Sequence, residues 1–179
     1  MNLPNKLTLG RVIAVPFFIA LFLTGHHYWS AVLFIAASAT DALDGHLARK
    51  NGLVTNFGKI MDPLADKILV ISALVLLVQT GDVAGWMVIV ILAREFTVSG
   101  LRTVAAADGL VIAAGMTGKI KTVLQMIAVP LLLLDNWPFI YLGNIPADRM
   151  MLWACVIMTI VSGIEYVVRN RSVFARGGI

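Results

Sequence analysis

Four aspartates are spaced so that their carboxylates share helix faces in an otherwise apolar chain. Asp41 and Asp44 lie three residues apart, and Asp62 and Asp66 lie four apart. Spacings of three and four residues bring side chains to one face of a helix. A carboxylate within hydrocarbon costs about 3 kcal/mol or more. The cluster therefore predicts bound cations or a catalytic task.

The four carboxylates suit a hard divalent cation. Oxygen ligands without clustered Cys or His favour Mg²⁺ or Mn²⁺, and a pair of such ions is the usual means of phosphoryl transfer. Gly45 and Ala48 continue the face of Asp41 and Asp44, and Gly58 precedes Asp62 by one turn. Such small residues leave room for a bulky ligand, so a pyrophosphate between two ions is expected.

Two other interpretations of the aspartates remain open. They could pair with Arg49, Lys59 and Lys67 as a solvated cytoplasmic rim. They could also form an ion-transport site, although such sites tend to lie at the midplane between discontinuous helices, whereas these residues cluster towards one end. A catalytic metal site accounts better for four carboxylates on two matched faces.

Composition places these residues in a membrane protein. The chain has 179 residues, of which 59% are hydrophobic and 13% charged, against roughly a quarter charged in soluble domains. No polar region is long enough for a separate soluble domain. Residues 1–179 are expected to form a single membrane domain of the all-α class.

Apolar runs between glycine and proline breaks predict six transmembrane helices and a short N-terminal interfacial segment at 2–8. The short connection between the second and third helices makes them antiparallel neighbours, which would let the two aspartate faces meet. The expected spans are 9–25, 28–49, 59–80, 85–105, 118–135 and 149–168.

The basic residues predict the orientation. If both termini share a side with the 50–58 and 106–117 loops, that half holds 13 of the 14 Lys and Arg residues and the other keeps only Arg149. The positive-inside rule then places both termini in the cytoplasm. The net charge of +4 indicates an anionic membrane surface or anionic substrates rather than nucleic acid.

The segment from residue 41 to 66 matches the signature D-x2-D-G-x2-A-R-x8-G-x3-D-x3-D at all eight fixed positions. In this respect the chain resembles the CDP-alcohol phosphotransferase family. The resemblance implies a six-helix membrane fold that transfers a phosphatidyl or similar group from a CDP-activated donor to an alcohol. It also implies a homodimer.

The same resemblance implies roles for individual residues. Asp41, Asp44 and Asp62 would bind two divalent cations, Mg²⁺ or Mn²⁺, with Asp66 sharing the second and acting as general base towards the acceptor hydroxyl. Asn5 and Thr8 could bond the nucleotide or simply cap the first helix. The residues expected at the CDP donor are Asn5, Thr8, Gly45, Ala48, Arg49 and Gly58.

Three further segments, opening at Asn2, Arg94 and Gly118, resemble the bacterial branch whose acceptor is sn-glycerol 3-phosphate. This branch implies CDP-diacylglycerol as donor, and phosphatidylglycerol phosphate and CMP as products. The alternatives are a cardiolipin synthase of the same family, a member that uses inositol phosphate or serine, and a divalent-cation transporter from another class. The expected location is the bacterial plasma membrane, multi-pass, with the active site facing the cytoplasm and membrane lipids as partners.

A phosphorylated acceptor requires additional cations. Arg94, near mid-membrane, must face a polar cavity or a carboxylate. Glu95 lies about 100° away on the helix and is predicted not to pair with it, but to share a face with Ser99 and Arg102. For Arg102, Lys119 and Lys121, the alternative is that the side chain extends (snorkels) to the lipid headgroups. The residues predicted to bind the acceptor phosphate are Arg11, Arg94, Arg102, Lys119 and Lys121.

Overall fold

The computed structural model describes residues 3–51, 56–107, 109–110, 112–113, 115–143 and 145–171, and this part of the chain contains helices and turns but no β-strand. The side chains of 3–8, 41–51, 56–63, 66 and 107 lie outside the description. The all-helical prediction is confirmed for the described residues. The α-helices are α1 (Leu3–Leu23), α2 (His27–Asn51), α3 (Asn56–Gln79), α4 (Gly85–Ala107), α5 (Met116–Leu133) and α6 (Ala147–Arg169), and a 3₁₀ turn covers Phe139–Tyr141.

The helix boundaries agree with the sequence prediction to within three residues, except at the first helix. There the predicted start at residue 9 is wrong, because α1 begins at Leu3 and continues unbroken to Leu23. Pro4 does not interrupt it, since a proline in the first turn lacks only an N–H that would have no intrahelical partner.

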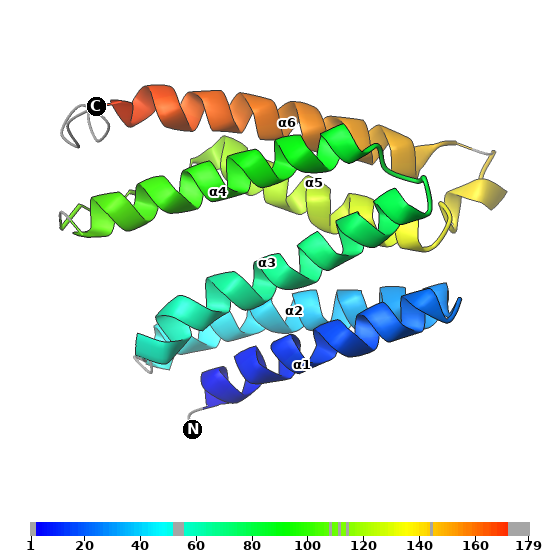
Figure 1. The fold of residues 1–179 in the computed structure, drawn as a ribbon, viewed down its shortest axis with the longest axis horizontal. Coiled ribbons are helices and arrows are strands. Elements are labelled where there is room, and N and C mark those ends of the chain that lie inside the picture. Colours follow the sequence, from blue (N-terminus) through cyan, green and yellow to red (C-terminus); the bar gives the residue numbers. More distant parts are fainter. Residues whose placement is uncertain are drawn as a thin grey trace.

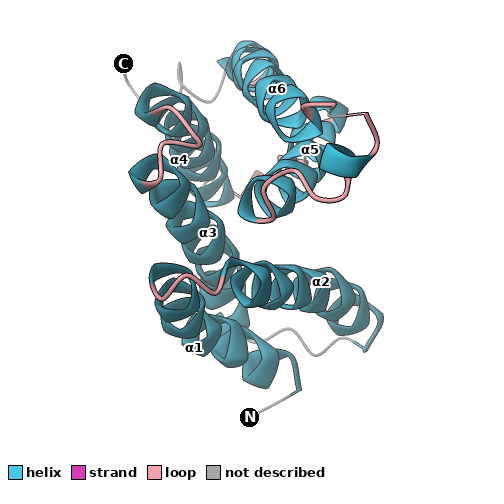
Figure 2. Ribbon diagram, turned by 90° about the vertical axis from the view of Figure 1, so that its right-hand side faces the viewer, coloured by secondary structure: helices cyan, strands magenta, loops and turns pink. Residues whose placement is uncertain are grey.

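Consecutive helices run antiparallel (Figure 1). The start of α1, the end of α2, the start of α3 and the end of α6 therefore lie at one end of the bundle. Helices α1 to α3 form one side and α4 to α6 the other (Figure 2). Among the described residues, α3 packs mainly against α1 and touches α2 less, while α5 and α6 form the most extensive pair.

The apolar core fills the opposite end of the bundle. It is built from the last turns of α1, α3 and α5 and the first turns of α2, α4 and α6. Phe18 and Phe34 are fully buried there with ring centroids 6.1 Å apart. Because this end is filled with apolar side chains, a polar site has to lie at the other end, which we call the cavity end.

The outward surface is also apolar. Ile89, Phe96 and Ile164 are each at least 60% exposed. By length and composition, α5 and α6 could cross a membrane, and shorter apolar stretches cover Leu9–Leu23 and Lys67–Gln79. Only 33% of each candidate span is buried within the protein, so most of this apolar surface faces outward.

Candidate functional site

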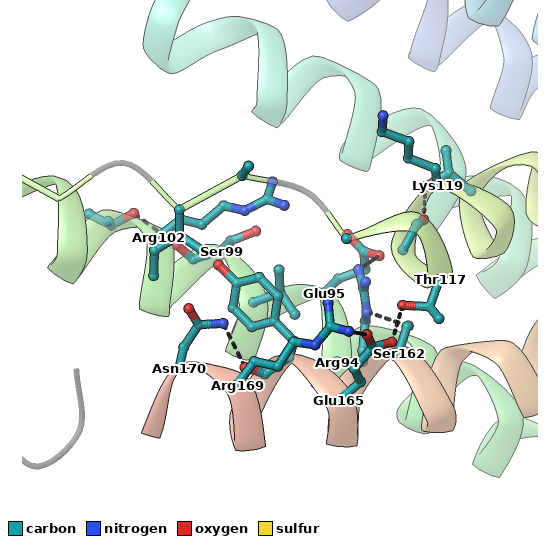
Figure 3. Close-up of a pocket in the computed structure, with 18 of the residues that line it drawn as sticks. Arg94, Glu95, Ser99, Arg102, Thr117, Lys119, Ser162, Glu165, Arg169 and Asn170 are labelled. Carbon is teal, nitrogen blue, oxygen red and sulfur yellow. Dashed lines mark hydrogen bonds and ion pairs between the residues drawn. The ribbon is translucent and has the colours of Figure 1, made fainter. Parts of the chain in front are cut away.

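A cavity of about 890 Å³ opens at the cavity end, between α4, the start of α5 and the end of α6 (Figure 3). Its lining also includes Lys67 from α3. Two acidic side chains, Glu95 and Glu165, face an excess of basic ones, which leaves the cavity positively charged. The basic residues that line it are Lys67, Arg94, Arg102, Lys119 and Arg169.

Glu95 is the centre of an ion-pair network in the cavity wall. Its Oε1 lies 2.6 Å from Nζ of Lys121 and 3.1 Å from Nη1 of Arg94, and its Oε2 lies 3.9 Å from Nζ of Lys67. Lys67 also donates to the Ser99 hydroxyl. One carboxylate therefore links α3, α4 and α5 while partnering three cations, so the group as a whole stays positive.

Arg94 was expected to face a polar cavity or a carboxylate, and it does both. Its Nε donates to Oγ of Ser162 at 3.2 Å and its Nη1 to Glu95. The prediction that Arg94 and Glu95 do not pair is therefore wrong. Neighbouring positions diverge by 100° at the backbone, but both side chains are long enough to turn towards each other. The predicted shared face is confirmed, since Glu95, Ser99 and Arg102 all line the cavity.

Arg102 lies at the wall formed by α4 and α6. Its guanidinium carbon is 5.6 Å from the ring centroid of Tyr166, within the range of a cation–π contact. Tyr166 is 7% exposed and packs with Val98 and Leu101. This small apolar cluster supports the arginine, whose side chain remains exposed.

A clamp between α5 and α6 borders the same cavity. Oγ1 of Thr117 donates to Oε2 of Glu165 at 2.6 Å, and Arg169 pairs with Oε1 of Glu165 at 2.9 Å. Figure 3 shows these side chains beside Arg94 and Ser162. The clamp fixes the first turn of α5, which carries Lys119, against the last turns of α6.

The structure brings together three of the five residues predicted to bind the acceptor phosphate: Arg94, Arg102 and Lys119 all line the cavity. Lys121 does not line it. That residue is 2% exposed and bonds Glu95 and Gln125. Arg11 is not in the lining either, and is buried in α1 with 3% of its surface exposed.

The predicted donor and metal residues lie outside the described side chains. Only their helices can be placed. Residues 41–49 are in the last half of α2 and 58–66 in the first half of α3, both at the cavity end (Figure 1). Elsewhere, the described side chains contain no group of three His, Cys, Asp or Glu that could hold a metal ion. The residues concerned are Asn5, Thr8, Asp41, Asp44, Gly45, Ala48, Arg49, Gly58, Asp62 and Asp66.

Sequence reasoning missed the network and the clamp. Glu95 was assigned no cationic partner, and Thr117 was not considered for the site. Arg169 was not among the residues predicted for the site. Its spacing of four residues from Glu165 was a usable signal, because such pairs share a helix face. The contact of Thr117 with Glu165 spans 48 residues and depends on how α5 meets α6.

Comparisons with known proteins agree on one family. Residues 1–161 match the profile of the CDP-alcohol phosphatidyltransferase family. The chain is 50% identical to a CDP-diacylglycerol–glycerol-3-phosphate 3-phosphatidyltransferase of Bacillus subtilis, over 94% of this chain and 95% of the relative. It is 41% identical to a protein of the same name from Rickettsia bellii, over 92% and 93%. It is 38% identical to a probable phosphatidylglycerophosphate synthase of Mycobacterium tuberculosis, over 94% and 81%.

Proposed function

The chain belongs to the CDP-alcohol phosphatidyltransferase family, and from this we infer that it makes phosphatidylglycerol phosphate. It transfers the phosphatidyl group of CDP-diacylglycerol to sn-glycerol 3-phosphate and releases CMP. The name shared by relatives at 50% and 41% identity supports this activity. Their alignments cover 94% and 92% of this chain, which includes the aspartate segment.

The observation that carries the choice of acceptor is the positive cavity. A phosphate monoester brings between one and two negative charges at neutral pH. Arginines bind such a group through charge-assisted hydrogen bonds. Arg94, Arg102 and Lys119 supply donors of this kind, and we place the phosphate of the acceptor among them.

The transfer breaks one phosphorus–oxygen bond and forms another. One of the two hydroxyl oxygens of glycerol 3-phosphate attacks the phosphatidyl phosphorus, and CMP leaves with the electron pair of the broken bond. The hydroxyl proton passes to a carboxylate, for which we propose Asp66. Residues that hold the acceptor phosphate assist by keeping this hydroxyl in line with the phosphorus.

The proposed donor site fits divalent cations by its chemistry. The segments that carry Asp41, Asp44, Asp62 and Asp66 belong to the end of α2 and the start of α3, and these helix ends lie at the cavity end (Figure 1). Four carboxylates without thiolates form a hard donor set. Asp41, Asp44 and Asp62 would hold two such ions, with Asp66 contributing to the second. Bound there, Mg²⁺ or Mn²⁺ neutralises pyrophosphate charge.

We propose that all six helices span the plasma membrane with both termini in the cytoplasm. Each helix contains between 18 and 25 residues, or about 27 to 38 Å at 1.5 Å per residue, close to a hydrocarbon core of about 30 Å. The basic residues at the cavity end support a cytoplasmic site. By family resemblance we also propose a homodimer, which native mass spectrometry of the detergent-purified protein would test.

The activity is tested by CMP release from CDP-diacylglycerol by the purified protein with Mg²⁺. Glycerol 3-phosphate, phosphatidylglycerol, serine and inositol phosphate are offered separately. Release is expected only with glycerol 3-phosphate, and a chelator should abolish it. Release with phosphatidylglycerol instead would indicate a cardiolipin synthase, and release that survives the chelator would overturn the proposed metal site.

A further inference from the structure

Two glycines on different helices face the side chain of Arg94. A Cβ atom added at Gly118 of α5 would lie 2.9 Å from Nη2 of Arg94. A Cβ atom added at Gly163 of α6 would lie 3.1 Å from Cγ and 3.8 Å from Cβ of Arg94. The arginine therefore occupies a slot between α5 and α6 in which a Cβ atom at either glycine would force the Arg94 side chain to shift.

The slot and two hydrogen-bonding partners together fix the guanidinium. Ser162 accepts from Nε and Glu95 from Nη1, while the backbone at Gly118 lies against the Nη2 side. Only 12% of the Arg94 side chain remains exposed. An arginine held in this way can bind an anion without losing further side-chain freedom, which is the energetic advantage of a preorganised site.

Gly118 is not required by its own backbone. It is the third residue of α5 and its φ lies outside the left-handed region, so an alanine could adopt the same backbone. Gly100, by comparison, has nothing within 4 Å of an added Cβ atom. A glycine in the first turn of a helix, directly against the terminal nitrogen of a cavity arginine, is explained by the space that the arginine needs.

We propose that Gly118 and Gly163 are positioning residues that hold the Arg94 guanidinium at the cavity wall, and that the affinity for the phosphorylated acceptor depends on the glycine at 118. This inference rests on the proposed function, because it assigns Arg94 to the acceptor phosphate. Gly118 acts on the far end of a flexible side chain. Gly163 faces the Cβ and Cγ atoms of Arg94, which are harder to displace.

The test is the kinetics of Gly118→Ala, with Gly100→Ala as the matched control for a methyl group added to an exposed helical glycine. Loss of one charge-assisted contact predicts a KM for glycerol 3-phosphate about tenfold higher or more. The KM for CDP-diacylglycerol should stay within about twofold of the wild type in the same assay. Gly100→Ala should match the wild type in both constants.

Arg94→Lys provides the decisive background, because lysine has no Nη2 atom for the new methyl group to meet. Arg94→Lys alone should raise the KM for glycerol 3-phosphate. Adding Gly118→Ala to it should change that KM by less than about twofold, whereas independent effects would multiply.

Each possible result either supports the proposed slot or overturns it. A Gly118→Ala enzyme whose KM for glycerol 3-phosphate equals that of Gly100→Ala overturns the slot. A Gly118→Ala substitution that changes this KM by the same factor in the wild-type and Arg94→Lys backgrounds also overturns it. So does a Gly118→Ala protein that fails to fold, because the clash is with a movable side-chain end. A wild-type protein that releases no CMP with glycerol 3-phosphate would refute the proposed function instead, and is thereby distinguished.

Discussion

Asp66 and Asp41 carry the same charge but are proposed to do different work. Asp66 is proposed to accept the hydroxyl proton as well as to share the second cation, whereas Asp41 is proposed only to hold a cation. Asp66→Asn should therefore lower kcat by about a hundredfold or more while retaining fold and metal affinity better than Asp41→Asn, which should lose both activity and metal affinity.

Metal affinity is measured by titrating Mn²⁺ and following its electron paramagnetic resonance, and activity by CMP release. Equal and mild effects of the two substitutions on kcat would contradict the assignment of Asp66 as base.

Glu95 is expected to be essential for stability as well as for the site. Its removal leaves Lys121, which is 2% exposed, without its carboxylate. Breaking a buried pair by removing one partner costs about 3–5 kcal/mol, so Glu95→Ala should unfold at a clearly lower denaturant concentration in detergent.

The double variant Glu95→Ala/Lys121→Met is the control, because it removes the buried charge together with its partner. It should recover much of the lost stability. If Glu95→Ala were as stable as the wild type, the network around Glu95 would have no structural role.

Side-chain partners were less predictable than side-chain faces. The helical period placed Glu95, Ser99 and Arg102 on one wall, and this was right because face depends on backbone geometry alone. The period wrongly predicted that Arg94 and Glu95 do not pair, because their flexible side chains bend across the 100° that separates neighbouring helix positions. Lys121 was predicted to meet substrate, whereas its ammonium bonds Glu95 and Gln125. Its burial depends on how α5 packs against its neighbouring helices, which no local pattern encodes.

The helices themselves were predictable because apolar runs between breakers define them. Five of the six agree at both ends to within three residues. The first was mispredicted at its start, since the polar residues before Leu9 were interpreted as an interfacial segment although they continue the helix. Helix pairing was harder to predict. The packing of α3 mainly on α1 among described residues depends on side-chain shape rather than on loop length.

The clamp between α5 and α6 should matter for the acceptor. Thr117→Val keeps the shape of the side chain but removes its 2.6 Å bond to Glu165, a bond to a charged group worth about 1.5–3 kcal/mol. The first turn of α5 would loosen and displace Lys119, so the KM for glycerol 3-phosphate should rise.

Thr159→Val is the matched control, because the Thr159 hydroxyl bonds only Cys155 of its own helix. It should leave the KM near the wild-type value. An identical KM in both variants would show that the clamp does not position the acceptor site.

The molecule has one end filled by apolar side chains and another that holds the cationic cavity. If the cavity end is cytoplasmic, the connection between α4 and α5 lies inside the cell and the one before α6 outside. In a Cys155→Ala background, Ile145→Cys should react with a membrane-impermeant maleimide on intact cells, and Leu110→Cys only after permeabilisation. Both positions are exposed in the protein. The reverse labelling pattern would invert the proposed topology.

The central proposal is that the cationic cavity binds the acceptor phosphate. The most direct test is to measure the KM for each substrate in Arg102→Gln, because Arg102 lines the cavity. The control is Arg149→Gln, because Arg149 lies at the opposite end of the molecule, where it pairs with Asp82. We expect the KM for glycerol 3-phosphate to rise about tenfold or more in Arg102→Gln alone, with the KM for CDP-diacylglycerol unchanged in both variants. A rise in the KM for CDP-diacylglycerol instead, or no difference between the two variants, would contradict the assignment of the cavity to the acceptor.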